Sequence, residues 1–155
     1  MSDGEQHPFE VVARECRKRF GEPPRTAIIL GSGVGTLRDE VTDSESASYK
    51  DLGLPVTTVS GHSGDVIVGH LGGGRVAMLS GRIHSYEGGA LEQAVRGVRG
   101  MAAWGVEKLV MTSAVGSVLP ELMPGDLLRV TDHINLMGIN PLVGPNIESL
   151  GPRFP

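Results

Sequence analysis

The chain has 155 residues, a size typical of one domain, with a formal net charge of −4 at neutral pH and a hydrophobic content of 39%. This balance offers no basic face to a nucleic acid or a membrane surface, and no apolar run reaches the length of a transmembrane helix. The single cysteine excludes an internal disulfide, and the polar N-terminus lacks the apolar core of a signal peptide. These features predict a cytoplasmic protein that binds neither nucleic acid nor membrane.

The first predicted elements are a helix and a buried strand. Residues 8–20 place their apolar side chains on one helical stripe, and Gly21 suits the end of that helix. The run TAIIL at residues 26–30 predicts a short buried strand that ends in a glycine-rich turn. Residues 37–55 are polar and irregular, so no regular element is predicted there.

The rest of the chain alternates between strand and helix patterns. Two strand-like runs surround three consecutive glycines within residues 65–81, which predicts a β-hairpin. Apolar residues at helical spacing cover residues 89–106, and the strand KLVMT follows at 108–112. A further strand with a polar end is predicted over 125–136, whereas the proline-containing residues 138–155 indicate a loop. The pattern predicts one domain of the α/β class.

Three of the predicted strands end in small or polar residues. The first runs into Gly-Ser-Gly, the second strand of the hairpin into Arg-Ile-His, and the third into Ser-Ala-Val-Gly. Ligands of open α/β sheets bind beyond the carboxyl ends of the strands. We therefore expect these segments, which are distant in the sequence, to lie close together in space.

The turn after the first strand has glycine at every second position, with Ser32 between Gly31 and Gly33. Neither the dinucleotide-binding pattern nor the P-loop pattern fits, because the third glycine of the former and the lysine of the latter are missing. Exposed backbone N–H groups and the Ser32 hydroxyl suit a small oxyanion such as phosphate. A tight turn that binds nothing explains the same residues equally well.

The segment GRIHSYEG places Arg82, His84 and Tyr86 at alternate positions, on one side of the chain if the segment is extended. The guanidinium fork of Arg82 matches phosphate oxygens, and His84 adds a donor. With the flat face of Tyr86, these groups indicate a site for a phosphate next to a ring or a sugar. A solvated polar loop is the less favoured alternative.

The remaining motifs carry weaker signals. The backbone near Ala114 can cap an oxyanion, although close packing of a turn explains TSAVGS better when that segment is taken alone. His62, between glycines, reads as a surface residue. Because His62, His70 and His84 belong to different predicted elements, the sequence argues against a zinc site. It also lacks the G-x-S-x-G elbow of a serine hydrolase.

Taken together, the motifs resemble those of one known family, the trimeric purine nucleoside phosphorylases. The segments that carry the resemblance occur in the family's order, from about residue 8 to the end of the chain: ILGSGVG, SGHSG, GRIHSYEG, TSAVGS, PGDLLRVTDHINLMGINPLVGPN and RFP. The resemblance implies a central mixed β-sheet flanked by helices, in a homotrimer. It also implies reversible phosphorolysis of purine nucleosides to a free purine and ribose 1-phosphate, without a metal or an organic cofactor.

The resemblance also assigns roles to residues. Tyr86 matches a tyrosine near the ribose. His84 matches a histidine of the family, and the resemblance implies that it both binds phosphate and takes part in catalysis. The phosphate-binding positions implied by the family are Ser32, His62, Arg82, His84 and the backbone of Ala114. The phenylalanine that one family subunit lends to its neighbour's ribose pocket aligns with Leu150.

Family chains are nearly twice as long, so the resemblance implies a truncated nucleoside phosphorylase domain over residues 1–155 that lacks the C-terminal part of the fold. The missing part would carry the groups that grip the purine, and the base preference is therefore not predicted. Two alternatives remain beside the enzyme: a truncated phosphate-binding protein without catalysis, and an inactive fragment of such an enzyme.

Overall fold

The computed structural model describes residues 6–56 and 64–154. Its longer elements are α1 (Pro8–Phe20), β1 (Thr26–Leu30), β2 (Thr42–Ser48), β3 (Asp65–Leu71), β4 (Gly74–Ser80), α2 (Leu91–Trp104) and β5 (Lys108–Met111). Short 3-10 helices cover Gly35–Glu40, Ser85–Glu87 and Glu148–Leu150. None of the helices in the described ranges is long and apolar enough to cross a membrane.

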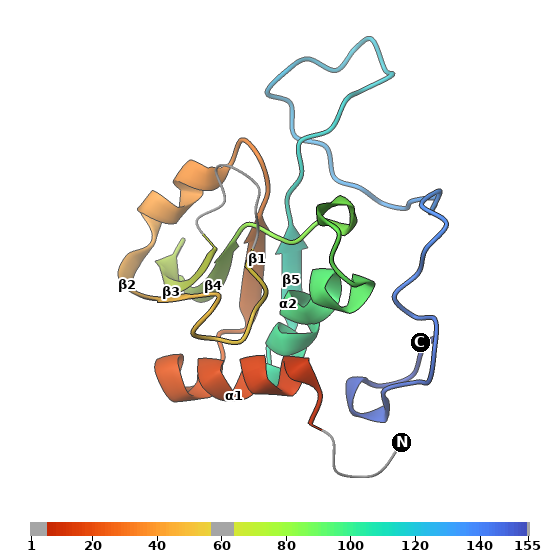
Figure 1. Cartoon of the computed structure of the whole chain (residues 1–155). Helices are drawn as coiled ribbons and strands as arrows, with labels where there is room; N and C mark the ends of the chain where they lie inside the picture. The colour runs from red at the N-terminus through yellow and green to blue at the C-terminus, as the bar shows by residue number, and fades with distance from the viewer. Residues whose placement is uncertain (1–5, 57–63, 155) are drawn as a thin grey trace.

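The five strands form one mixed sheet in the order β2-β3-β4-β1-β5 (Figure 1). Strand β1 lies between β4 and β5 and runs parallel to both, whereas β2, β3 and β4 form an antiparallel meander. Because β1, β4 and β5 run in one direction, their carboxyl ends lie at the same edge of the sheet. The expected α/β class with a central mixed sheet is confirmed.

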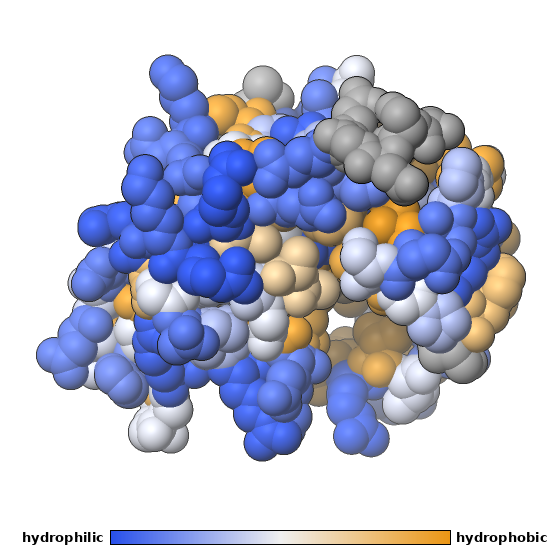
Figure 2. Space-filling view, turned by 90° about the horizontal axis from the view of Figure 1, so that it is seen from below, coloured by the Kyte–Doolittle hydropathy of each residue, from blue (hydrophilic) through white to orange (hydrophobic). Residues whose placement is uncertain are grey.

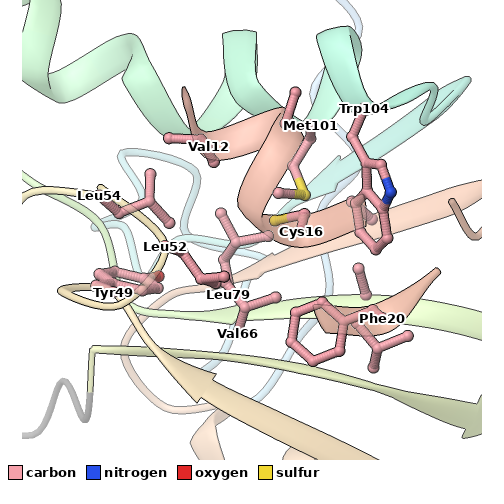
Figure 3. Packing of buried hydrophobic residues seen from close by; sticks show 14 of the residues in the cluster. Val12, Cys16, Phe20, Tyr49, Leu52, Leu54, Val66, Leu79, Met101 and Trp104 are labelled. Atoms are coloured by element: carbon pink, nitrogen blue, oxygen red, sulfur yellow. The ribbon is translucent and has the colours of Figure 1, made fainter. Parts of the chain in front are cut away.

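Alternate residues of the strands face two separate apolar clusters, as the two-residue period of a strand requires. On one face, β-strand residues such as Val66 and Leu79 pack against Val12 and Cys16 of α1 and Trp104 of α2 (Figure 3). On the other face, a smaller cluster gathers around the 3-10 helix that follows β1; its buried members are Leu30, Val41, Ile67, Val76 and Met78.

The two long helices approach each other closely where α2 carries Gly100. A Cβ atom added at Gly100 would lie 2.6 Å from Cγ1 of Val12 in α1. The Nε1 of Trp104 donates a 3.1 Å hydrogen bond to the carbonyl oxygen of Gly21, and Arg17 donates one of 3.1 Å to the Trp104 carbonyl oxygen. These contacts hold the C-terminal ends of α1 and α2 together on one face of the sheet.

Most sequence-based predictions of elements are confirmed, and two are wrong. The confirmed elements are the helix over 8–20, the strand over 26–30, the hairpin, the helix ending near residue 104 and the strand at 108. Strand β2 lies within residues 37–55, where none was predicted, because its sequence TDSESAS is polar on both faces, as suits an exposed edge. The strand predicted over 125–136 is absent: these residues form turns and irregular backbone, since no neighbouring strand pairs with them.

Candidate functional site

The three strand ends singled out in the sequence are neighbours in the sheet. Strand β1 ends at Leu30, which is paired with Ser80 at the end of β4, and Ile29 is paired with Met111 at the end of β5. The loops that follow β4, β1 and β5 therefore leave the sheet side by side, at its carboxyl edge (Figure 1). This is the position at which ligands bind in open α/β sheets.

The loop after β1 is held against the loop after β5. The backbone N–H of Gly31 donates a 2.8 Å hydrogen bond to Oγ1 of Thr112, and this hydroxyl donates one of 3.2 Å to the Ile29 carbonyl oxygen. A Cβ atom at Gly31 would lie 2.2 Å from the carbonyl oxygen of Thr112, so only glycine fits there. Gly33 has a φ of +87°, which favours glycine for a second reason.

The side chain of Arg82 connects the loop after β4 with the loop after β5. Its Nη1 donates a 3.0 Å hydrogen bond to the Thr112 carbonyl oxygen, and its Nη2 donates one of 3.1 Å to Oγ of Ser113. Strand β1 lies between β4 and β5, so the guanidinium spans the end of β1. Arg82 thereby brings a positive charge to the place where the three loops meet.

His84 is oriented by Glu87, a residue of the following 3-10 helix. The Glu87 carboxylate is almost fully buried, and its Oε1 accepts a 2.7 Å hydrogen bond from the His84 backbone N–H and lies 3.1 Å from the ring Nδ1. Because a carboxylate oxygen only accepts, this ring contact is a hydrogen bond when Nδ1 carries the proton. The ring of His84 also stacks on Tyr86, with centroids 4.8 Å apart.

A buried tyrosine supports the start of the loop after β4. The hydroxyl of Tyr49 donates a 2.6 Å hydrogen bond to the carbonyl oxygen of Gly81, the residue before Arg82. Burial, and secondarily the charge of Asp65, raises the pKa of Tyr49 well above its ordinary value, so this hydroxyl keeps its proton and remains a donor. The hydrogen bond therefore ties the backbone next to Arg82 to the core.

The remaining predicted site residues are exposed or lie outside the described residues. Ser32, in the turn after β1, is exposed, and so is Ala114, in the loop after β5. Tyr86 is 75% exposed, which leaves the outer face of its ring open to solvent. His62 lies outside the described residues. The phosphate-binding, ribose-binding and catalytic roles of all the predicted site residues, Arg82 and His84 included, remain predictions.

The segment GRIHSYEG is not fully extended, so the condition for placing its three side chains on one side is not met, but the arrangement of His84 and Tyr86 is little affected. The segment is not extended throughout, because Ser85–Glu87 forms a 3-10 helix after His84. His84 and Tyr86 nevertheless share one side, since their rings stack at an angle of 17°. The guanidinium of Arg82 reaches instead across the sheet edge to the loop after β5.

Sequence reasoning missed three residues that shape this site: Thr112, Ser113 and Glu87. The signal for Glu87 was present, because a polar residue followed three positions later by glutamate is the spacing of a capping box, here with His84 in the first position. Nothing local in the sequence indicated that Thr112 and Ser113 accept hydrogen bonds from Arg82. That contact depends on the strand order, which joins residues 30 positions apart.

Comparison with known proteins identifies the family of this chain. The family model described as "Phosphorylase superfamily" matches residues 25–155. Purine nucleoside phosphorylase 1 of Geobacillus stearothermophilus is 44% identical over 148 residues, which cover 95% of this chain and 54% of that protein. Purine nucleoside phosphorylase 1 of Bacillus subtilis is 45% identical, with 95% of this chain and 55% of that protein covered.

Solved structures give the same result. The purine nucleoside phosphorylase of Schistosoma mansoni in complex with acetate superimposes with a TM-score of 0.85 at 39% identity, over 96% of this chain and 56% of that chain. The structure of a Schistosoma mansoni purine nucleoside phosphorylase with inosine superimposes with a TM-score of 0.84 at 38% identity, over 96% and 53% of the two chains. The present chain thus spans about half the length of the relatives that it matches, and it belongs to the phosphorylase superfamily.

Proposed function

We propose that this chain carries the phosphate-binding half of a purine nucleoside phosphorylase. The observation that carries the proposal is the guanidinium of Arg82, which bridges two of three adjacent parallel strand ends while the third contributes a glycine-rich turn. Cationic and backbone N–H donors that meet at one sheet edge suit a phosphate dianion. The relatives that are 44% and 45% identical to this chain are named purine nucleoside phosphorylases, which supports the substrate class.

In the proposed reaction, phosphate attacks the anomeric carbon of a purine nucleoside. The C–N glycosidic bond breaks and its electron pair leaves with the purine, while an oxygen of hydrogen phosphate forms the new C–O bond of ribose 1-phosphate. The purine takes up one proton, which balances the proton that hydrogen phosphate loses on forming the ester. The sugar develops positive charge in an oxocarbenium-like transition state. A phosphate held close to that carbon stabilises the charge and is positioned to form the bond, so the reaction requires no metal or organic cofactor.

The chain's own residues have distinct parts in this proposal. Arg82, the Ser32 hydroxyl and the backbone at Ala114 bind phosphate, together with His62 from outside the described residues. His84, with Nδ1 directed to Glu87, offers its other ring nitrogen to the phosphate as the catalytic group. Tyr86, stacked on His84 and open to solvent, covers the ribose with its exposed face.

The proposal includes a cytoplasmic homotrimer that takes part in purine salvage. Its support is the resemblance to the trimeric family and the position of Leu150, which lies in an exposed part of the chain where a neighbouring subunit can reach it. Light scattering on a chain extended to the length of its relatives tests this part. A trimeric mass is expected, and a monomeric mass would contradict it.

The decisive experiment measures phosphorolysis on two chains. With the second half of the Geobacillus protein appended, the chain is expected to release hypoxanthine from inosine only when phosphate is present. No phosphate-dependent release from a folded extended chain would overturn the proposed function. For the 155-residue chain alone we expect phosphate binding without turnover, which isothermal titration calorimetry and the same assay measure together.

A further inference from the structure

The chain bends at the end of β4, directly before Arg82. The N–H of Gly81 donates a 3.0 Å hydrogen bond to the carbonyl oxygen of Leu79, which closes a three-residue turn. Gly81 has a φ of +106°, in the region that favours glycine. The orientation of the Gly81 peptide therefore sets the direction in which the chain leaves the sheet toward Arg82.

The carbonyl oxygen of Gly81 is directed into the core. There it accepts the 2.6 Å hydrogen bond from the hydroxyl of Tyr49, the residue that follows β2. Both residues are buried. A buried carbonyl oxygen that loses its donor is costly, so removal of the hydroxyl should displace the Gly81 peptide.

Tyr49 is itself fixed in the core. Its N–H donates a 2.7 Å hydrogen bond to the carbonyl oxygen of Gly64, and its own carbonyl oxygen accepts one of 2.8 Å from the N–H of Leu54. Its ring packs in the same cluster as Leu52 and Leu54 (Figure 3). Seen from below, where α1 covers this cluster, hydrophilic side chains predominate on the surface (Figure 2). The hydroxyl is thus a donor held at a set position inside the protein.

A cavity of about 30 Å³ lies beside this hydrogen bond. Its walls are mostly apolar and come from Tyr49, from the loop residues 81–83 and from one side of α2. Protein interiors ordinarily leave few such spaces. Next to this cavity the loop after β4 lacks part of the close packing that fixes a core segment, so its hydrogen bonds contribute more to its position.

The guanidinium of Arg82 spans the end of β1 only if the backbone of Arg82 is held in place. Its hydrogen bonds to the Thr112 carbonyl oxygen and the Ser113 hydroxyl are 3.0 Å and 3.1 Å long, and such bonds weaken steeply as their geometry is distorted. Because Gly81 directly precedes Arg82, a shift of the Gly81 peptide moves the base of that side chain. The hydroxyl of Tyr49 and the loop after β5 thus hold Arg82 from its two ends.

We infer that Tyr49 is a positioning residue for phosphate binding: its hydroxyl, by donating to the Gly81 carbonyl oxygen, holds the loop after β4 so that Arg82 presents its remaining N–H groups to the oxyanion. The inference rests on the proposed function, which assigns phosphate to Arg82. Tyr49 does not contact the phosphate itself, because it is 3% exposed and belongs to the cluster on the helix-covered face of the sheet.

Tyr49→Phe tests the inference, because it removes the hydroxyl and keeps the ring that fills the core. Calorimetric titration of inorganic phosphate into the 155-residue chain should give a Kd about five- to twentyfold above that of the parent. Without phosphate, nuclear magnetic resonance should show the Arg82 guanidinium protons exchanging with water about threefold faster or more, because their hydrogen bonds open more often. Gly100→Ala, which disturbs the crossing of α1 and α2, is the control and should change neither quantity.

Gly81→Ala disturbs the same hydrogen bond from the acceptor side, because alanine is strained at a φ of +106°. It should also weaken phosphate binding, and the double variant should bind about as weakly as the weaker single variant, since both act through one contact.

Parental phosphate affinity in a folded Tyr49→Phe chain, an equal loss in Gly100→Ala, or unchanged guanidinium exchange would each overturn the inference. If Tyr49→Phe does not fold, parental affinity in Gly81→Ala would overturn it. A parent chain that binds no phosphate would instead overturn the proposed function, and the guanidinium exchange would still decide whether Tyr49 positions Arg82.

Discussion

Arg82 donates a 3.0 Å hydrogen bond from Nη1 to the carbonyl oxygen of Thr112, and this contact links the loops that follow β4 and β5 across the end of β1. The same guanidinium is the group that we expect to bind phosphate. The residue thus has two functions that a single substitution removes together: it stabilises the arrangement of the loops, and it supplies the positive charge at their meeting point.

Replacing Arg82 by alanine should weaken phosphate binding by about ten- to hundredfold, because charge-assisted hydrogen bonds are lost. Calorimetric titration of phosphate into the 155-residue chain measures this change. Arg82→Lys should recover only part of the affinity, since an ammonium group cannot donate to Thr112 and Ser113 in the same fork geometry. Arg129→Ala, at an exposed arginine of the segment after β5, is the control and should bind phosphate normally.

Replacing Glu87 by glutamine should lower kcat by about ten- to hundredfold in a chain extended to the length of its relatives, because His84 loses the carboxylate that fixes its ring. Phosphate affinity should change less. Nitrogen chemical shifts of the His84 ring give an independent readout: the proton on Nδ1 in the parent chain should be distributed over both nitrogens in the variant. An unchanged tautomer with reduced kcat would show that Glu87 acts in another way.

Gly100→Ala should destabilise the fold by about 1–3 kcal/mol, because the added methyl group overlaps Val12 where α1 and α2 cross. Gly97, one turn earlier in α2, offers a matched comparison. A Cβ atom there would lie 3.3 Å from a methyl group of Leu79, and the gain of about 1 kcal/mol in helix propensity offsets this milder crowding. Urea unfolding followed by circular dichroism measures both variants; equal effects would contradict the close helix crossing.

Burial raises the pKa of the Cys16 thiol to about 12, and the charge of Glu15 adds to the effect. In the unfolded chain the thiol ionises near its ordinary pKa of about 8.5. The folded state retains the proton over this interval, so the contribution of the group to stability is complete below about pH 8.5 and is lost as the pH rises toward 12. The urea concentration at the midpoint of unfolding should therefore decrease as the pH is raised from 8 to 10.5. The decrease should be smaller in the Cys16→Ala variant.

The thiol itself gives a second measure of the same burial. Iodoacetamide at about pH 8.5 should label Cys16 only after unfolding, because reactivity requires the thiolate. Rapid labelling of the folded chain would contradict the position of Cys16 between α1 and the sheet, where it has no exposed surface.

Local patterns predicted the elements of this fold well where burial is regular. The stripe of α1 and the run Thr26–Leu30 are examples, because their apolar residues follow the period of the element that they form. Strand β2 escaped prediction because an edge strand with both faces exposed needs no apolar alternation. The segment 125–136 misled in the opposite direction: its apolar residues suit a strand, but a strand requires a partner, and its sequence does not show whether one is present.

The candidate site was predictable in its composition and less so in its contacts. The rule that ligands bind at the carboxyl ends of strands was enough to bring Ser32, Arg82 and Ala114 to one edge of the sheet. The hydrogen bonds from Arg82 to Thr112 and Ser113 depend on β1 lying between β4 and β5, and a strand order is not encoded in any one segment.

The convergence of the three strand ends on one phosphate can be tested most directly by nuclear magnetic resonance. Inorganic phosphate is titrated into the isotope-labelled 155-residue chain, and backbone amide shifts are followed residue by residue. We expect saturable shifts in all three loops together, at residues 31–35, 81–84 and 112–115, with one common affinity that Arg82→Ala weakens. Shifts confined to one loop, different affinities in the three loops, or no saturable shift would contradict the account.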